Sequence, residues 1–174
     1  MQISIGNLMI TSFCSDSIKH QKFRFDLIRD DAIYEFVSTS IGKDLIELEE
    51  SEDIELEHSY IIQDNDELVG YIYIEGISEE EGIVELRYAV HPEYRRLGFL
   101  GQSDSNRRGY GQQILEECSK YLFTFDNINT VELHIRKDNY PSLGCAKKAK
   151  YNVSENNNEY YYVYRYSRGD TSEN

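Results

Sequence analysis

The sequence predicts a mixed α/β fold with a mostly antiparallel central sheet and flanking helices. The first observation is a strand–helix–strand order: residues 83–91 and 130–136 alternate as strands do, and apolar side chains recur at helical spacing over residues 109–125. This order implies a parallel crossover within the sheet. The second observation is a polar turn from Asp64 to Glu67 between two apolar segments, which predicts an antiparallel hairpin.

The first part of the chain leads into that hairpin. Residues 7–13 (NLMITSF) predict a first strand, and the acidic pair at 30–31 suits the N-cap of a helix over residues 32–37. Residues 44–57 alternate loosely between Leu or Ile and acidic residues, so this segment fits either a helix or an extended acidic arm. The hairpin then occupies residues 58–76.

The last part of the chain begins with residues 92–108, which are rich in Arg, Gly and Ser and predict an irregular segment. After the crossover we expect a short helix at residues 139–149 and a tyrosine-rich final strand at residues 159–167. The tail, residues 168–174, is expected to be frayed. No internal repeat and no Pro-rich or Gly/Ser-rich linker divides the sequence, so we expect one domain over residues 1–174.

Composition and charge exclude several classes of protein. The sequence has no run of about 18 apolar residues, which excludes a transmembrane helix, and its N-terminus lacks the pattern of a secretory signal. Cys14, Cys118 and Cys145 include no CxxC pair, which argues against a disulfide framework and a thiolate metal site and favours a reducing cytoplasm. The 18 basic and 32 acidic residues give a net charge of −14, which disfavours nucleic acid and anionic membranes and favours a cationic partner.

The charge is distributed unevenly along the chain. Residues 44–57 hold eight acids and no base, whereas residues 87–108 hold five arginines and two acids, a net charge of +3. A basic segment in an acidic chain is a candidate anion site. The acidity of the chain outside this basic segment is also compatible with a role in solubility alone.

Within the basic segment, Gly109 and Gly111 follow Arg107 and Arg108 and open the predicted helix. Such glycines let a phosphate approach the backbone, and the helix N-terminus favours an anion, although an ordinary tight turn has the same pattern. A similar Arg/Gly pattern occurs at residues 95–98. We assign the phosphate turn to the later copy, because only that copy is followed by helical periodicity.

Three motifs in this order resemble the GNAT superfamily of acetyl-CoA-dependent N-acetyltransferases. The fourth strand of that family often has the pattern EIxYxVxPEYRGKG, and residues 85–95 are ELRYAVHPEYR. The family's pyrophosphate motif, Q/R-x-x-G-x-G/A, corresponds to residues 106–111 (NRRGYG), which begin with Asn instead of Gln or Arg. Its later N-x-x-S/A pattern falls on Asn139 and Ser142. The specific match covers residues 83–151, and it implies a GNAT-like acetyltransferase fold.

The resemblance also implies that acetyl-CoA is the co-substrate and that no metal is needed. In the family, backbone groups of the fourth strand bind pantetheine and the Gly-rich motif binds the pyrophosphate. The corresponding residues of this chain are Tyr88, Ala89, Val90, Arg95, Arg96, Asn106, Arg107, Arg108, Gly109, Tyr110, Gly111, Asn139 and Ser142. Arg95 and Arg96 fit a solvated loop equally well.

The resemblance suggests catalytic roles as well. Glu85 matches a glutamate that acts as general base, often through water, in histone-type members; a structural strand carboxylate is the alternative. His134, on the following strand, fits either a proton relay or a surface position. Many members carry a Tyr that protonates the CoA thiolate at the position of Ala146, so Ser142 is the candidate acid here. The helical cysteines lie at apolar positions, which favours direct transfer in a ternary complex.

The acceptor implied by the resemblance is a primary amine. A Ser three residues after the motif Asn is closest to members that acetylate protein N-termini; a polyamine, an aminoglycoside or another small amine are further candidates. Two other classes remain open: a CoA-binding sensor or interaction domain without turnover, and an acidic protein-binding module that uses residues 44–57. The sequence is compatible with a homodimer and does not identify the acceptor.

Overall fold

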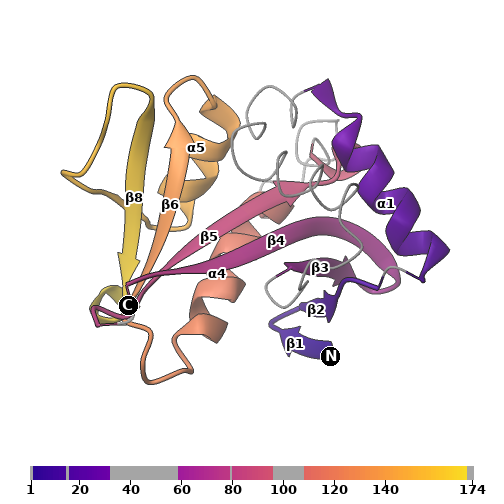
Figure 1. Ribbon diagram of the computed structural model, residues 1–174, viewed down its shortest axis with the longest axis horizontal. Helices are drawn as coiled ribbons and strands as arrows, with labels where there is room; N and C mark the ends of the chain where they lie inside the picture. The colour runs from indigo at the N-terminus through magenta and orange to yellow at the C-terminus, as the bar shows by residue number, and fades with distance from the viewer. Residues whose placement is uncertain (1, 15, 32–58, 79, 96–107, 172–174) are drawn as a thin grey trace. The chain divides into compact units, whose positions relative to one another are not determined.

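The computed structural model describes residues 2–14, 16–31, 59–78, 80–95 and 108–171 (Figure 1). In chain order, the elements are β1 (Gln2–Ile5), β2 (Leu8–Ser12), α1 (Ile18–Ile28), β3 (Ser59–Asp64), β4 (Glu67–Ser78), β5 (Ile83–Val90), the 3₁₀ helix η2 (Pro92–Tyr94), α4 (Tyr110–Leu122), β6 (Thr130–Arg136), α5 (Tyr140–Lys148), β7 (Asn152–Val153), β8 (Tyr161–Ser167) and the 3₁₀ helix η3 (Arg168–Thr171).

The strands of the described residues form one sheet in the order β1-β2-β3-β4-β5-β6-β8-β7. β5 and β6 pair in parallel, whereas the pairs β1–β2, β2–β3, β3–β4, β6–β8 and β7–β8 are antiparallel. A parallel pair requires a crossover, and α4 lies between β5 and β6 along the chain. The predicted mixed, mostly antiparallel class is therefore confirmed. The chain groups into two compact units: unit 1 contains Met1–Tyr73 and Tyr88–Tyr110, and unit 2 contains Ile74–Arg87 and Gly111–Asn174.

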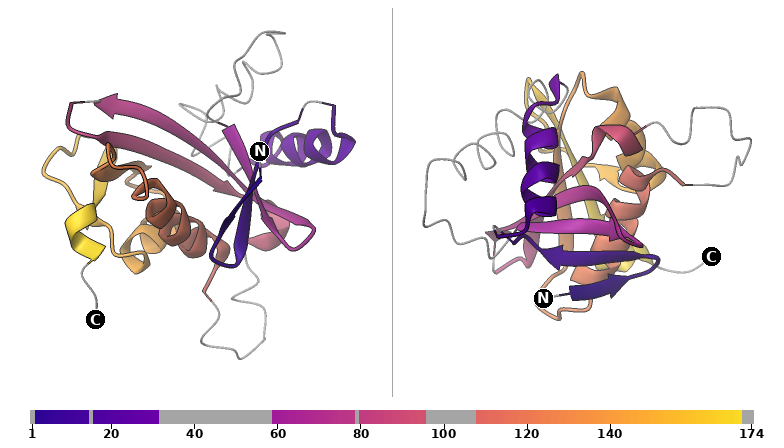
Figure 2. Two further views of the ribbon diagram at one scale, coloured as in Figure 1. Left: turned by 90° about the horizontal axis from the view of Figure 1, so that it is seen from below. Right: turned by 90° about the vertical axis from the view of Figure 1, so that its right-hand side faces the viewer.

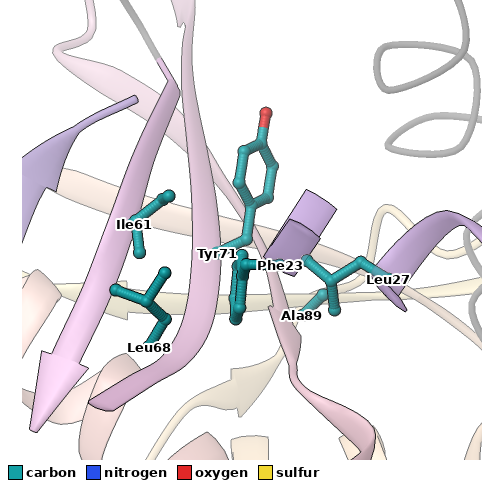
Figure 3. Packing of buried hydrophobic residues seen from close by; sticks show 6 residues of the cluster. All are labelled: Phe23, Leu27, Ile61, Leu68, Tyr71 and Ala89. Atoms are coloured by element: carbon teal, nitrogen blue, oxygen red, sulfur yellow. The ribbon is translucent and has the colours of Figure 1, made fainter. Parts of the chain in front are cut away.

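Unit 1 has a core to which α1 contributes one face. The helix begins where the Ser17 side chain accepts a hydrogen bond from the His20 N–H at 3.3 Å. From this start Phe23 and Leu27 lie four residues apart, on the same side of the helix. The buried residues of this core are Phe23, Leu27, Ile61, Leu68, Tyr71 and Ala89 (Figure 3). Leu27 has 0% exposure, so truncation to Ala would lower the free energy of unfolding by about 2–5 kcal/mol.

The prediction for the N-terminal segment is confirmed in part. Residues 7–13 contain the predicted strand, but it is the second one: β2 follows β1, and the two form a hairpin, seen in indigo in Figure 2. The helix α1 is not predicted, because Ile18 and Phe25 are exposed and its apolar pattern is therefore weak. The helix expected at residues 32–37 and the acidic segment 44–57 lie outside the described residues.

The hairpin and the crossover elements lie where the sequence predicts them. β3 and β4 flank a turn in which Asn65 has a φ of 54°. The helix α4 is amphipathic, and its buried residues are Gly111, Ile114, Leu115, Cys118, Ser119 and Leu122. The predicted helical spacing extends to Phe125, whereas the helix ends at Leu122, so Phe125 lies beyond it and is exposed. The predicted short helix is confirmed as α5 and the final strand as β8.

The end of the chain differs from the expectation. The two-residue strand β7, which is too short to give a sequence signal, pairs with β8. Residues 168–171 form η3 and are not frayed, because the Arg168 guanidinium donates to the carbonyl of Ile128 at 2.7 Å and to that of Phe125. Residues 172–174 lie outside the described part. Over the described ranges, no helix is long and apolar enough to cross a bilayer.

Candidate active site

The predicted base Glu85 and the residues predicted to bind pantetheine follow one another along β5, whereas the predicted acid Ser142 lies on α5. Glu85 belongs to unit 2, as do Gly111, Asn139 and Ser142. The predicted residues that belong to unit 1 and are described are Tyr88, Ala89, Val90, Arg95, Arg108, Gly109 and Tyr110. Three predicted residues lie outside the described residues: Arg96, Asn106 and Arg107.

Glu85 is a buried carboxylate with 7% exposure. Its Oε1 accepts a hydrogen bond from Arg87 Nε at 2.9 Å, and its Oε2 accepts one from a terminal nitrogen of the same guanidinium at 3.3 Å. The two side chains meet because residues two apart on a strand share a face. Arg87 also contacts Glu75 of β4 at 2.8 Å. The pairing with Arg87 offsets the desolvation of the Glu85 charge.

His134, the predicted relay residue, lies beside Glu85 within unit 2. Its Nδ1 is 3.8 Å from Glu85 Oε1, and its Nε2 is 2.6 Å from Glu132 Oε1. β5 and β6 pair in parallel with Glu85 opposite Glu132, which places His134 on the same face as both carboxylates. The His134 side chain is 40% exposed, so solvent reaches it.

Glu132 is a second buried carboxylate, with 5% exposure, and the sequence analysis did not single it out. Its Oε2 accepts a hydrogen bond from Arg165 Nε of β8 at 2.6 Å, and the two residues are cross-strand partners. The alternation in residues 130–136 (TVELHIR) places Glu132 on one face with His134, and that pattern is the signal that could have identified it.

These side chains form one group, which we call the charged cluster; its members are Glu75, Glu85, Arg87, Glu132, His134 and Arg165. Three carboxylates and two guanidinium groups give the cluster a net charge of −1 when the imidazole is neutral. The charge becomes zero when the imidazole is protonated. The cluster can therefore accept one proton without acquiring a net positive charge.

In unit 1, the end of β5 is held by Arg95. Its Nε donates to the Val90 carbonyl at 2.8 Å, and a terminal nitrogen of its guanidinium lies 2.6 Å from Asp30. Ala89 is buried and belongs to the core described above. Arg95 thus has protein partners, and its predicted contact with a CoA phosphate stays a prediction.

The start of α4 is fixed by two tyrosines of unit 1. The rings of Tyr94 and Tyr110 meet edge to face, with their centroids 5.8 Å apart. The Tyr110 hydroxyl donates to Asp64 at 2.6 Å, and the Tyr94 hydroxyl donates to Glu67 at 3.0 Å. Burial and the Glu67 hydrogen bond both raise the pKa of Tyr94 above its usual value. Residues beside the β3–β4 turn therefore hold the first residue of α4.

The described part of the predicted phosphate turn is open. Arg108 and Gly109 are exposed and directly precede α4. Among the described residues, apart from the two chain neighbours, no atom lies within 4 Å of a Cβ built at Gly109. The space beside this glycine, next to the N-terminus of a 13-residue helix, suits the approach of an anion.

Asn139 and Ser142 have a local structural role at the start of α5. The Asn139 Oδ1 accepts a hydrogen bond from the Ser142 N–H at 3.2 Å, so Asn139 is the N-cap of the helix. Ala146, at the position where many family members carry a Tyr, has 0% exposure. Their predicted roles in binding and acid catalysis stay predictions.

None of the three cysteines, all within the described residues, forms a disulfide, and their environments differ. Cys118 is buried, and this burial raises the pKa of its thiol far above the usual value, which disfavours a nucleophilic thiolate. Cys14 is exposed and Cys145 is half-buried. Among the residues that the structure describes, no group of three His, Cys, Asp or Glu residues could hold a metal ion.

Comparison with known proteins identifies relatives of the whole chain. Residues 9–152 match the family model of the acetyltransferase (GNAT) domain. No curated protein sequence matches the chain. Among solved structures, the chain is similar to an acetyltransferase (GNAT family) from Bacillus anthracis, with 15% identity, a TM-score of 0.67, and coverage of 96% of this chain and 98% of that one.

Two further structures contain ligands. The spermidine N-acetyltransferase from Vibrio cholerae, solved with CoA and spermine, has 16% identity and a TM-score of 0.64, with coverage of 91% of this chain and 93% of that one. The aminoglycoside acetyltransferase AAC(6')-Ib, solved with coenzyme A and kanamycin, has 14% identity and a TM-score of 0.64, with coverage of 94% and 96%. At these identities the similarity shows the fold.

Proposed function

Because this chain belongs to the GNAT acetyltransferase family, we propose that it transfers an acetyl group from acetyl-CoA to a primary amine by direct transfer in a ternary complex. The observation that carries this proposal is the buried Glu85 carboxylate. It is held by Arg87 and lies beside His134, on the strand whose next residues match the pantetheine-binding stretch. A carboxylate at this place can take the proton of an acceptor amine.

The acetyl donor would bind along the end of β5 and at the start of α4. Open space beside Gly109 and the helix N-terminus support a site for the pyrophosphate there. The residues that we assign to acetyl-CoA are those of the family motifs: Tyr88, Ala89, Val90, Arg95, Arg96, Asn106, Arg107, Arg108, Gly109, Tyr110, Gly111, Asn139 and Ser142.

The reaction requires a neutral amine and a leaving group that accepts a proton. An ammonium ion has no lone pair, so one N–H bond must break and the proton passes to Glu85, directly or through water. The nitrogen then attacks the thioester carbonyl carbon, the C–N bond forms and the C–S bond breaks. A second N–H bond breaks as the amide forms, and the CoA thiolate leaves with a proton. Ser142 is our candidate donor of that proton, and the proton released by the nitrogen restores the Ser142 hydroxyl, directly or through water.

The acceptor that we propose is a cationic amine. The net charge of −14 favours a cationic partner over an anionic one. Two structural relatives were solved with spermine and with kanamycin, and this supports amine acceptors as a class. A protein N-terminus remains a candidate on the Asn139–Ser142 pattern alone. We retain the single acetyltransferase domain over residues 1–174 and the cytoplasmic location as parts of the proposal.

A coupled assay distinguishes this function from its alternatives. Thiol release from acetyl-CoA is measured with spermidine, kanamycin and a peptide with a free N-terminus, and thermal shift with acetyl-CoA is measured in parallel. Release with at least one amine, together with a thermal shift, supports the proposal. A thermal shift without thiol release supports the CoA-binding sensor. The absence of both signals supports a binding module that needs no CoA.

A further inference from the structure

The two ring nitrogens of His134 are held unequally by the carboxylates on either side. The 2.6 Å between Nε2 and Glu132 Oε1 is a hydrogen-bond distance, whereas the 3.8 Å between Nδ1 and Glu85 Oε1 is beyond one. A bare nitrogen lone pair would repel a carboxylate oxygen at the shorter distance. In the neutral imidazole, Nε2 therefore carries the hydrogen and Nδ1, next to Glu85, is an acceptor.

Glu132 is itself held in one orientation. Its Oε2 accepts the 2.6 Å hydrogen bond from Arg165 while its Oε1 accepts from His134. A carboxylate with both oxygens bonded, at 5% exposure, has little freedom to rotate. The orientation of the His134 ring therefore depends on Glu132, which Arg165 holds in place.

We propose that Glu132 is a positioning residue for proton removal: it fixes His134 so that Nδ1 receives the proton that Glu85 takes from the acceptor amine. This inference rests on the proposed function. A water that hydrogen-bonds to both Glu85 Oε1 and His134 Nδ1 can span the 3.8 Å between them.

The proton balance of this relay is complete without another reactant. One N–H bond of the ammonium breaks and an O–H bond forms at Glu85. The O–H bond then breaks, a proton moves through the bridging water, and an N–H bond forms at Nδ1. The imidazolium brings the charged cluster to zero net charge, and its 40% exposure lets the proton leave to solvent.

The pH dependence of this step depends on every charged group around the imidazole. In the part of the chain that the structure describes, these groups come from four strands: Glu75 of β4, Glu85 and Arg87 of β5, Glu132 and Arg136 of β6, and Arg165 of β8. Arg136 is paired with Asp138, and the residue opposite His134 on β8 is the buried Val163. Glu132 is the group in hydrogen-bond contact with the ring, so its charge should affect the imidazole most.

The first test reads the tautomer directly and needs no turnover. In a nitrogen–proton correlation spectrum of the isotope-labelled protein, neutral His134 should carry its proton on Nε2. In Glu132→Gln this preference should be lost, because the amide can donate as well as accept. His20 and His91, both in unit 1, are internal controls whose signals should not change. The His134→Gln variant assigns the resonance.

The second test measures turnover with the best amine of the panel. In Glu132→Gln we expect kcat to fall by about 10-fold and the acidic limb of the pH profile to move to lower pH, with the KM for acetyl-CoA unchanged. Adding Glu132→Gln to His134→Gln should cause no further loss, because both act through one relay. Glu117→Gln, which removes the charge of a carboxylate paired with Lys120 on α4, is the matched control and should match the parent.

The outcomes separate this inference from the proposed function. A wild-type His134 that carries its neutral-state proton on Nδ1 overturns the inference whatever the activity. The inference is also overturned if Glu132→Gln keeps kcat within about twofold of the parent with the same pH profile. If no amine of the panel is acetylated, that result counts against the proposed function. The tautomer measurement still decides whether Glu132 positions His134.

Discussion

Replacement of Glu85 by Gln removes the proposed base while keeping the shape of the side chain. In the parent, both carboxylate oxygens accept hydrogen bonds from Arg87, at 2.9 Å and 3.3 Å. Gln keeps one acceptor oxygen, so the shorter of these bonds can persist without its negative charge. The amide cannot accept a proton from an ammonium ion, so deprotonation must occur in solution before the amine binds.

The expected loss of stability in Glu85→Gln is small and the expected loss of kcat is large, so the two effects can be measured separately. A hydrogen bond to a charged group contributes about 1.5–3 kcal/mol and a neutral one about 0.5–1.5 kcal/mol, so the variant should lose about 1 kcal/mol of unfolding free energy. Loss of a general base typically lowers kcat by about 10²-fold, or about 2.7 kcal/mol of barrier. The protein should remain folded, so the activity loss reports chemistry.

The assay is thiol release as a function of pH, with the melting temperature as the folding control. We expect the activity of Glu85→Gln to recover partly at high pH, where free amine is available, and the KM for acetyl-CoA to stay unchanged. If the variant turns over within about twofold of the parent from about pH 6 to about pH 9, the base is water or another residue.

Three further predictions test the donor site, the buried Ser119–Tyr151 pair and the buried His20. Gly109→Val should weaken acetyl-CoA binding in calorimetry by about 10-fold, or about 1.4 kcal/mol. The melting temperature should not change, because no atom of the described residues beyond the chain neighbours lies within 4 Å of a Cβ at this position. Gly169→Val, at a similarly open glycine, should bind normally, and equal affinities of the two variants would contradict the site. Ser119→Ala should lower the melting temperature more than Tyr151→Phe. It removes the acceptor to which the buried Tyr151 hydroxyl donates, whereas Ser119 keeps its own bond to the Leu115 carbonyl when Tyr151 is changed. The reverse order would contradict this reasoning. Burial and nearby Lys19 lower the pKa of His20, so the unfolded chain takes up a proton more readily than the folded protein, and the stability should fall as the pH drops below about 6.5. His20→Asn keeps an acceptor for the Cys14 N–H and should flatten this part of the profile of melting temperature against pH. An unchanged slope would mean that other groups cause the pH dependence.

The elements that the sequence predicts correctly are those with strong local patterns. α4 buries apolar residues at regular helical spacing, and β6 alternates in burial along its length. α1 has no such pattern: of its side chains that the structure describes, Phe23 and Leu27 belong to the buried cluster, while Ile18 and Phe25 are exposed. Its existence depends on packing against strands distant in sequence, which a local pattern does not contain.

In the candidate site, too, some residues are marked by local sequence patterns and others are brought together only by the fold. Glu85 stands in a motif that singles it out as a candidate. The alternation along β6 places Glu132 on one face with His134, but only the register of the parallel pair places Glu132 opposite Glu85. Register across a crossover is not encoded in either strand alone. Asn139 shows the converse case, because the family pattern suggests a binding residue and the structure adds a role as helix N-cap.

The central claim is that this chain transfers an acetyl group directly to an amine. Mass spectrometry of a reaction with isotope-labelled acetyl-CoA and the amine panel tests it most directly, because it follows the label in the amine and in the intact protein. We predict that one label enters the amine for each CoA thiol released, that the protein mass stays unchanged during turnover, and that Glu85→Gln slows labelling. Label that accumulates on the protein would contradict direct transfer, and label that stays on CoA in the presence of every amine would contradict acetyl transfer itself.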